Sequence, residues 1–481
     1  MMPTVKEFLQ FRRAFVFVVF IGIFAMAARN VLDPDIWWHL KTGEWIAQHR
    51  AVPHSDPFSY TRAGQPWVAH EWLSELIIYG IFRSAGYGGL ILIFAGIISA
   101  AFVPLYLRCK TNAVIAGSVT VWGALATTVV WGVRPQIFSF LLLSLWLLIL
   151  ERSEKKPRLL WWTLPITLIW VNLHAGFILG PAFLALFIAG EFAEFIESHF
   201  SGRTAVPRLR WLSLTLLADL VLAALNPNGA AIFRYVLDTM RSVPMQRYIT
   251  EWASPDFHSA DYRAFFFLVL ATFGTLAVSS RKTRLRDLLV LLAGTAAALS
   301  SVRMIPLFVL AAVPPIARAT AERFPLGESR AGPARVGSGL LHALILLIVA
   351  IFSAAHTFLV IQRQPQAEAA AFPTTAVAYL QQHPPSGPIF NYYSWGGYLI
   401  FKAYPQIRVF IDGRADIYGE GLTQYGETYL LQKNWRLPLS QWKVTTVIVP
   451  PQGPLASALR EMPEWSLRYE DSVSVVFFKS F

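Results

Sequence analysis

The sequence predicts a polytopic α-helical membrane protein with a small α/β domain after its last membrane span. Of the 481 residues, 55% are hydrophobic and only 15% are charged, whereas soluble globular proteins carry roughly 25% charged residues. The mean hydropathy is +0.47. Such a chain lacks the polar surface of a soluble protein of this size, and it is too apolar to be intrinsically disordered.

Apolar segments of about 20 residues, the length that crosses a membrane, recur as far as residue 361. We count about eleven of them. They lie at 14–31, 88–107, 112–132, 136–150, 159–173, 176–197, 210–225, 263–280, 287–302, 304–318 and 338–361. No small-residue cleavage pattern follows the first segment, so we expect an uncleaved span rather than a signal peptide.

Lys and Arg residues predict the orientation, because basic loops stay on the cytoplasmic side of a membrane. Basic residues precede the first span. The short basic loops that follow are expected on the same side of the membrane as this amino-terminal segment. These loops lie near 108–110, 152–158, 203–210, 281–286 and 318–335. The amino terminus is therefore expected inside. The net charge of +12 is distributed by membrane side, so it does not indicate nucleic-acid binding.

Three outer segments are too long for turns: residues 32–87, 226–262 and 362–481. The last alternates strand-like and helix-like stretches, which predicts a small α/β domain, with 362–371 as its tether. Expected strands are Pro388–Tyr392, Arg408–Asp412, Thr445–Val449 and Val473–Phe478, and expected helices are Tyr398–Ala403, Leu422–Lys433 and Leu455–Glu461. The single cysteine, Cys109, lies at an inner membrane edge and excludes a disulfide scaffold.

Polar motifs from distant parts of the chain are expected at the outer face, where ionisable groups at membrane depth are candidates for function. They predict a cavity open to the outside at the lipid–water boundary. The residues concerned are Asp33, Asp35, His39, His70, Glu71, Arg134, Asn172, His174, Asn226–Gly229, Arg303 and Pro306.

Each motif also has a structural alternative. Asp33 can cap a helix that Pro34 begins, and the Trp37-Trp38 pair suits either an interfacial belt or a substrate platform. His70 and Glu71 are either metal ligands or the polar face of a surface helix.

Arg134 and Arg303 suit a substrate phosphate but equally a helix end, and Arg134 also suits a lipid headgroup. His174 suits the site or simple packing. In the carboxy-terminal domain, four residues suit either acceptor recognition or structure, with Arg414 then paired to Asp416 or to the membrane domain. These four are Trp395, Asp412, Arg414 and Asp416.

Several common chemistries lack their motifs. The chain has no phosphate-binding loop for ATP, no His-Glu-x-x-His zinc motif and no Gly-x-Ser-x-Gly nucleophile turn. No matched pair of broken helices suggests a transporter repeat.

The layout resembles the GT-C superfamily of membrane glycosyltransferases, including its protein O-mannosyltransferase-like and aminoarabinose-transferase-like branches. The resemblance rests on an inner amino terminus, one span, and an outer loop that opens with Asp33-Pro34-Asp35. More narrowly, motifs along nearly the whole chain resemble a widespread bacterial family of uncharacterised polytopic membrane proteins. These motifs are Asp33–Leu40, His70–Leu73, Arg134–Gln136, Asn172–Gly176 and Phe410–Arg414.

The resemblance implies a GT-C-like transmembrane domain over 1–361 and a periplasmic domain over 362–481, in a bacterial inner membrane. It also implies transfer of a sugar from a polyprenyl-phosphate carrier to a periplasmic lipid, glycan or protein. Chemically, Asp33 or Asp35 suits the base on the acceptor hydroxyl in an inverting reaction, or a ligand of Mg²⁺ or Mn²⁺. Arg134 and Arg303 suit the departing phosphate. Several GT-C enzymes carry a second acidic motif between spans three and four, where Arg134 stands instead.

Two other functions remain open. A flippase or transporter of lipid-linked glycans would need alternating access and would form no transfer product. A non-catalytic assembly protein for envelope glycans would depend on residues 362–481 and tolerate amides at Asp33 and Asp35.

Overall fold

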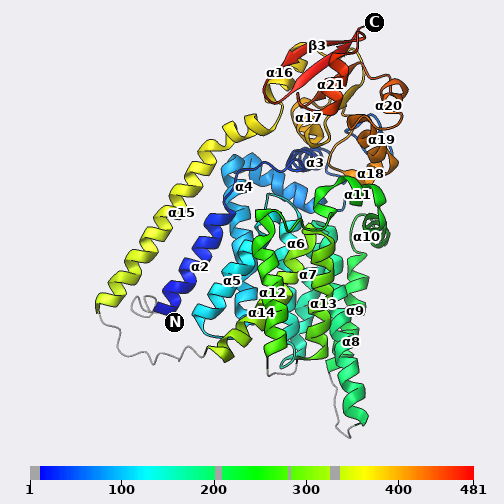
Figure 1. Ribbon diagram of the computed structural model, residues 1–481. Coiled ribbons are helices and arrows are strands. Elements are labelled where there is room, and N and C mark those ends of the chain that lie inside the picture. Colours follow the sequence, from blue (N-terminus) through cyan, green and yellow to red (C-terminus); the bar gives the residue numbers. More distant parts are fainter. Residues whose placement is uncertain (1–10, 201–207, 280–282, 325–335, 481) are drawn as a thin grey trace.

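A computed structural model describes residues 11–200, 208–279, 283–324 and 336–480. A bundle of helices carries a small mixed domain at one end, and α3 (Ile36–His49) lies between the two parts (Figure 1). The chain crosses from the bundle into this domain through the long helix α15 (Val336–Ala371).

Every apolar segment predicted from the sequence overlaps one helix of the bundle. These helices are α2 (Phe11–Ala27), α4 (Trp72–Cys109), α5 (Ala113–Thr127), α6 (Gln136–Arg152), α7 (Thr163–Leu173), α8 (Leu179–Phe200), α9 (Arg208–Ala223), α12 (Arg263–Val278), α13 (Leu285–Ser300), α14 (Ile305–Arg323) and α15.

In the described part of the chain, 6 helical segments are long and apolar enough to cross a membrane. They contain α4, α5, α8, α12, α14 and α15. Leu340, Leu347 and Phe352 of α15 are exposed on its surface, as lipid-facing side chains would be. The protein is therefore a helical membrane protein, and the count of about eleven crossings stays a prediction.

The orientation also stays a prediction. Some of the basic residues used for it lie outside the described residues. These are Lys6, Arg203, Arg281, Lys282, Arg330 and Arg335.

Two glycines shape the first outer loop. Gly86 divides α4 into two limbs, since its φ of +58° is a backbone conformation that glycine adopts without a steric penalty. Gly43 lets α3 approach the backbone of α4, because a Cβ at this position would overlap the carbonyl of Glu75. The residue one turn before Gly43 is His39, which is thereby held against the first limb of α4.

The second outer loop forms a platform of short helices below the carboxy-terminal domain. It contains α10 (Ala231–Arg241), α11 (Val243–Tyr248), and two 3₁₀ turns, η4 (Thr250–Trp252) and η5 (Ala260–Tyr262). The ring of Tyr248 leaves no space for a side chain at Gly426 in α19 (Glu420–Tyr429), so α11 and α19 are closely packed.

The carboxy-terminal domain contains a four-stranded sheet in the order β1-β2-β4-β3. Strand β1 pairs in parallel with β2, and the other two pairings are antiparallel. The strands are β1 (Ile389–Asn391), β2 (Thr446–Val449), β3 (Trp465–Glu470) and β4 (Val475–Lys479). The remaining helices are α16 (Thr374–Gln382), α17 (Gly396–Ala403), α18 (Ala415–Tyr418), α20 (Arg436–Gln441) and α21 (Pro454–Arg460). The expected small α/β domain is confirmed.

One strand prediction was wrong, and one strand was not predicted. The segment Arg408–Asp412 is not part of the sheet, because the side chain of Asn391 satisfies its backbone. Asn391 Oδ1 accepts from Phe410 N at 2.8 Å, and Asn391 Nδ2 donates to Ile411 O at 2.8 Å. The sheet instead has an edge strand at Trp465–Glu470, whose alternating polar residues are largely exposed.

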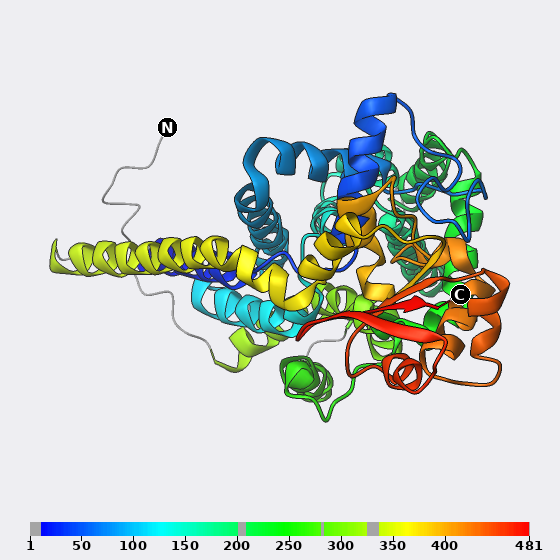
Figure 2. The same cartoon turned by 90° about the horizontal axis from the view of Figure 1, so that it is seen from above.

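The expected tether at 362–371 is the last part of α15, not a separate linker. Gln364 in this part is buried. Its side-chain amide forms hydrogen bonds with both backbone groups of Val31, just before the first acidic motif. Gln364 Nε2 donates to Val31 O at 3.0 Å, and Gln364 Oε1 accepts from Val31 N at 2.8 Å. The helix that leads to the outer domain therefore also positions the residues that follow α2 (Figure 2).

The outer domain docks onto the first outer loop through buried aromatic residues. The ring of Trp37 lies 4.9 Å from Tyr398 and 5.2 Å from Phe372, centroid to centroid. Trp37 is fully buried, and Trp38 nearly so. Trp37 therefore forms neither an interfacial belt nor a substrate platform, because the domain covers it.

Candidate active site

The first acidic motif begins α3. Asp33 Oδ1 accepts a hydrogen bond from the backbone N–H of Asp35 at 2.9 Å. The N-cap residue of α3 is Asp35, so the alternative in which Asp33 caps a helix that Pro34 begins is wrong. The helix itself begins at Ile36, two residues after Pro34. Asp33 thus has a local structural contact, and its Oδ2 still faces Arg134.

Arg134 joins both aspartates to an acid from the second outer loop. Its Nε lies 3.2 Å from Asp33 Oδ2, and its Nη2 lies 2.7 Å from Asp35 Oδ2. Its Nη1 contacts Glu251 in η4. We call these four residues the acid–arginine cluster. One guanidinium thus faces three carboxylates, and the cluster keeps an excess of negative charge when all are ionised.

Burial controls the protonation of this cluster. Burial raises the pKa of Asp35 to about 7, with Arg134 opposing the shift and the charges of Asp33 and Glu251 adding to it. Burial also raises the pKa of Asp33. A carboxylate with a pKa near neutrality is suited to accept a proton at physiological pH.

Arg303, from η6 (Val302–Met304), lies beside this cluster. Its Nη2 donates to Gln136 Oε1 at 3.3 Å, and its guanidinium lies 5.7 Å from the ring centre of Trp252. Among the described residues it forms no ion pair. Arg303 thus offers a cation that no described carboxylate neutralises at contact distance.

The outer domain covers Asp35. Gly413 lies against its carboxylate so closely that a Cβ would overlap Asp35 Oδ1 and approach Trp38 Nε1. Trp38 Nε1 donates to the same oxygen at 3.1 Å. Gly397 similarly permits close approach to Pro34 O, 2.8 Å from its Cβ position. The site therefore lies between the membrane bundle and the outer domain.

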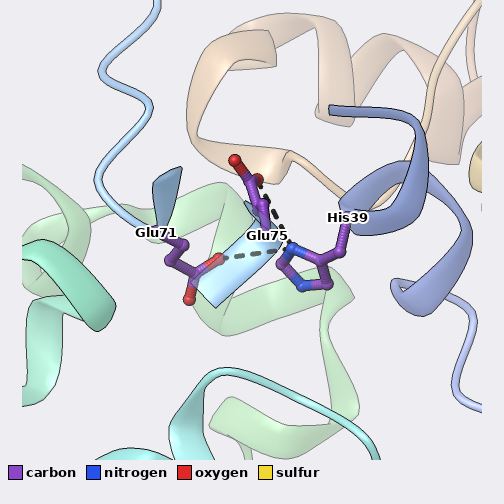
Figure 3. Close-up of side chains that lie close together, drawn as sticks. All are labelled: His39, Glu71 and Glu75. Atoms are coloured by element: carbon purple, nitrogen blue, oxygen red, sulfur yellow. Dashed lines mark hydrogen bonds and ion pairs between the residues drawn. The ribbon is translucent and has the colours of Figure 1, made fainter. Parts of the chain in front are cut away.

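A second group of polar residues surrounds His39, which lies one turn after Asp35 on α3. It comprises His39, His70, Glu71, Glu75 and His174, which we call the histidine–glutamate cluster. His39 Nδ1 lies 3.8 Å from Glu71 Oε2 and 3.5 Å from Glu75 Oε1 (Figure 3). The other Glu71 oxygen lies 3.5 Å from His70 Nε2 and 3.4 Å from His174 Nε2.

Burial disfavours the charged forms of all the groups in this cluster, and neighbouring charges decide which of them still ionise. Burial lowers the pKa of His39 to about 3 and that of His174 to about 3, so both are neutral near pH 7. Burial opposes ionisation of Glu71, but the charge of His70 and its hydrogen bond hold the pKa of Glu71 well below its usual range.

Asn172 and His174 are held by structural contacts. Asn172 Oδ1 accepts from Trp72 Nε1 at 2.9 Å, at the start of α4. His174 Nδ1 accepts from the backbone of Gly176 at 2.9 Å and lies 2.7 Å from Ser139 Oγ. The turn Asn226–Gly229 is closed by the side chain of Asn226 and contributes no group to either cluster.

Three of the four residues proposed in the outer domain have structural partners, and Asp416 lies near the histidine–glutamate cluster. Asp412 accepts two bonds from Arg414, at 2.8 and 2.7 Å. Arg414 Nη1 donates to Asp56 Oδ1 at 2.7 Å, so Arg414 pairs with Asp412 and with the first outer loop rather than with Asp416. Trp395 is buried and donates to Ala371 O at 3.3 Å. Asp416 lies near enough to His70 to affect its charge.

The arrangement does not favour a divalent cation at Asp33 and Asp35, where the guanidinium of Arg134 already supplies the positive charge. In the described part of the chain, the residues that could hold a metal ion are instead His39, Glu71 and Glu75. Their donor atoms all lie within 4.8 Å of one another.

Three residues of the site were not predicted from the sequence: Glu75, Glu251 and Gly413. The Glu71–Glu75 spacing, four residues at a helix start, is a signal that both carboxylates share a face. Glu251 and Gly413 carry no comparable local signal, because each reaches the site only through packing of a distant segment.

Solved structures share this fold. An archaeal oligosaccharyltransferase, AglB from Archaeoglobus fulgidus in complex with an inhibitory peptide and a dolichol-phosphate, matches 97% of this chain and 74% of its own, with 11% identity and a TM-score of 0.59. An oligosaccharyltransferase from the same organism in its apo form matches 90% of this chain and 69% of its own, with 12% identity and a TM-score of 0.52.

The chain has a GT-C fold. ArnT from Cupriavidus metallidurans, bound to undecaprenyl phosphate, is aligned over 96% of both chains, with 12% identity and a TM-score of 0.49. No family model and no curated protein matches the sequence. The two oligosaccharyltransferase structures confirm the expectation of a GT-C fold, while the narrower bacterial family stays a prediction.

Proposed function

We propose that this GT-C protein is a membrane glycosyltransferase. It transfers a sugar from a polyprenyl-phosphate carrier to an acceptor hydroxyl at the outer face of a bacterial inner membrane. Its amino terminus is cytoplasmic, and its outer domain is periplasmic. The fold supports this function class, and the structure of AglB, which shares the fold, contains a dolichol-phosphate.

The observation that carries the proposal is the environment of Asp35. Its carboxylate lies between Arg134 and Gly413, at the junction of the bundle and the outer domain. It is mostly buried, and its pKa is near 7. A base that must deprotonate a sugar or lipid hydroxyl needs this combination of a raised pKa and a held orientation.

The reaction follows as a single displacement. Asp35 accepts the proton of the acceptor hydroxyl while the hydroxyl oxygen forms a bond to the anomeric carbon of the donor sugar. The bond from that carbon to the phosphate oxygen breaks, and its electron pair leaves with the phosphate. The products are the glycosylated acceptor, the polyprenyl phosphate, and protonated Asp35. Attack opposite the leaving group inverts the anomeric centre.

The phosphate gains a negative charge in this step, so a nearby cation stabilises the transition state. Arg134 is engaged with three carboxylates and is suited to orient Asp35. Arg303 has no carboxylate partner among the described residues and is suited to bind the phosphate bidentately. We therefore assign the phosphate to Arg303 first and to Arg134 second.

Thermal unfolding in detergent tests this assignment without knowledge of the sugar, because polyprenyl phosphate is the product of every such donor. We expect undecaprenyl phosphate, but not phosphatidic acid, to raise the Tm by about 2–5 °C. Arg303→Ala should remove the effect. Arg234→Ala, which changes an exposed arginine of the second outer loop, should retain it. Equal stabilisation by both lipids, or an unchanged response in Arg303→Ala, would contradict the proposal.

A further inference from the structure

The transfer step uses no residue of the histidine–glutamate cluster, yet that cluster is buried. His39, Glu71 and Glu75 are 2%, 7% and 1% exposed. Burying two carboxylates is costly unless each is paired with a cation or well hydrogen-bonded. The cluster therefore needs an explanation beyond that of the acid–arginine cluster.

The distances within the cluster suit ligands of one ion better than direct ion pairs. Charge-assisted hydrogen bonds measure about 2.7–2.9 Å, whereas His39 Nδ1 lies 3.5 Å from the nearest oxygen of Glu75 and 3.8 Å from that of Glu71. Two ligands bound tetrahedrally at about 2.1 Å from one zinc ion lie roughly 3.4 Å apart. The observed separations of 3.5 and 3.8 Å are close to that value.

Glu75 provides a second, independent observation. Its Oε1 lies 3.5 Å from His39 Nδ1 (Figure 3), whereas its Oε2 is buried with no hydrogen-bond partner among the described residues. An unsatisfied carboxylate oxygen in such surroundings is rare in folded proteins. A bound cation would satisfy this oxygen together with the neighbouring carboxylate of Glu71.

The surrounding contacts hold the ligands in place. Close packing at Gly43 sets His39 against the first limb of α4. His70 Nδ1 lies 3.2 Å from Val68 O, which directs its Nε2 toward Glu71. Because His174 Nδ1 accepts from Gly176, the hydrogen-bond pattern assigns its proton to Nε2, which faces the same Glu71 oxygen. Such outer contacts orient a carboxylate ligand.

We propose that His39, Glu71 and Glu75 bind a divalent transition-metal ion of the zinc type. His39 supplies Nδ1, the two glutamates supply carboxylate oxygens, and His70 and His174 hold the free oxygen of Glu71. An imidazole ligand favours Zn²⁺ over Mg²⁺, which prefers oxygen ligands alone. The ion joins α3 to the first limb of α4 and is distinct from the catalytic aspartates.

Metal analysis and titration calorimetry test this site on the full-length protein, purified through a tag without histidine. We expect about one bound zinc ion per chain after dialysis against Zn²⁺. Glu75→Gln and His39→Gln should weaken Zn²⁺ binding by at least about tenfold. Glu44→Gln and His49→Gln, matched changes elsewhere on α3, should not. A thousandfold excess of Mg²⁺ should not displace the ion.

Two results would overturn the proposal: wild-type protein that binds no Zn²⁺, or Glu75→Gln and His39→Gln variants that bind it as tightly as wild type. Gel filtration and thermal melts confirm that each variant is folded, and Glu71→Gln provides a third ligand change if one of the others misfolds. Asp35→Asn should retain the metal. Loss of transfer in Asp35→Asn with zinc retained separates this site from the proposed function.

Discussion

Two polar clusters meet at α3, where Asp35 and His39 lie one helical turn apart, and the clusters are built differently. In the acid–arginine cluster, Arg134 contacts its carboxylates at hydrogen-bonding distances of 2.7 and 3.2 Å. In the histidine–glutamate cluster, the corresponding distances run from 3.4 to 3.8 Å. Asp35 and His39, four residues apart on one helix, belong to the two different clusters.

The difference follows from the source of positive charge. Arginine is permanently protonated, so Arg134 carries the cation of the first cluster within the chain itself. In the second cluster, no lysine or arginine of the described residues forms an ion pair with Glu71 or Glu75, and their nearest cationic partners are histidine nitrogens at 3.4–3.8 Å. Two buried glutamates without a close ion pair are the situation that a bound cation relieves. Proton transfer is thus assigned to the first cluster and metal binding to the second.

Asp35→Asn is expected to have the largest effect, and this effect should be confined to the acid–arginine cluster. Without its base, transfer should fall by about 10²–10⁴-fold, measured as polyprenyl phosphate released from a panel of polyprenyl-phosphate-linked sugars. Asp33→Asn should cost less, because the proposed base is Asp35 and Asp33 acts on it through Arg134. Full activity in Asp35→Asn would exclude the proposed base and favour a flippase or an assembly protein.

A smaller loss is expected from Gly413→Ala, which would place a methyl group against the carboxylate of Asp35. A displacement of the base by about 1 Å should lower transfer by roughly 10²-fold, without loss of bound zinc. Gly421→Ala is the control, since its Cβ would meet only ordinary contacts near 3.7 Å. Equal activity in the two variants would show that the outer domain does not shape the site.

The pH profile should report the charge of the first cluster. Because the pKa of Asp35 is raised to about 7, kcat/KM should increase with pH as the carboxylate ionises and then level off above that value. Arg134, Asp33, Trp38 and Glu251 all act on this group.

Glu251→Gln removes a negative charge that raises the pKa of Asp35, so the acid limb should move to lower pH by up to about one unit. Asp238→Asn, an exposed change in the same outer loop, should leave the profile in place. A profile that moves to higher pH in Glu251→Gln would contradict Asp35 as the titrating base.

The smallest effect is expected from chelation. EDTA should lower the Tm of the wild type by about 2–6 °C, because the metal binds only the folded protein. It should leave the Tm of Glu75→Gln almost unchanged. The stabilisation by undecaprenyl phosphate should persist in EDTA, since no ligand of the metal contacts Arg303. Loss of that stabilisation in EDTA would indicate that the metal and the lipid phosphate share one binding site.

Much of the fold could be predicted from local sequence patterns. Each apolar segment became a helix, and the small outer α/β domain is present, because hydropathy and turn residues act over short distances. The segment Arg408–Asp412 differed, since its apolar residues suggested a strand while the distant Asn391 bonded its backbone. Trp37 differed likewise, because a domain hundreds of residues later covers it.

The sequence by itself determined the membrane class of the protein and the identity of Asp33, Asp35, Arg134 and His39 as candidates. These follow from composition and from the position of charged residues at the ends of apolar segments. Only the tertiary structure decided which charges meet. Arg134 pairs with Glu251, and Glu75 faces His39, because helix packing rather than sequence distance places side chains within a few ångströms of one another.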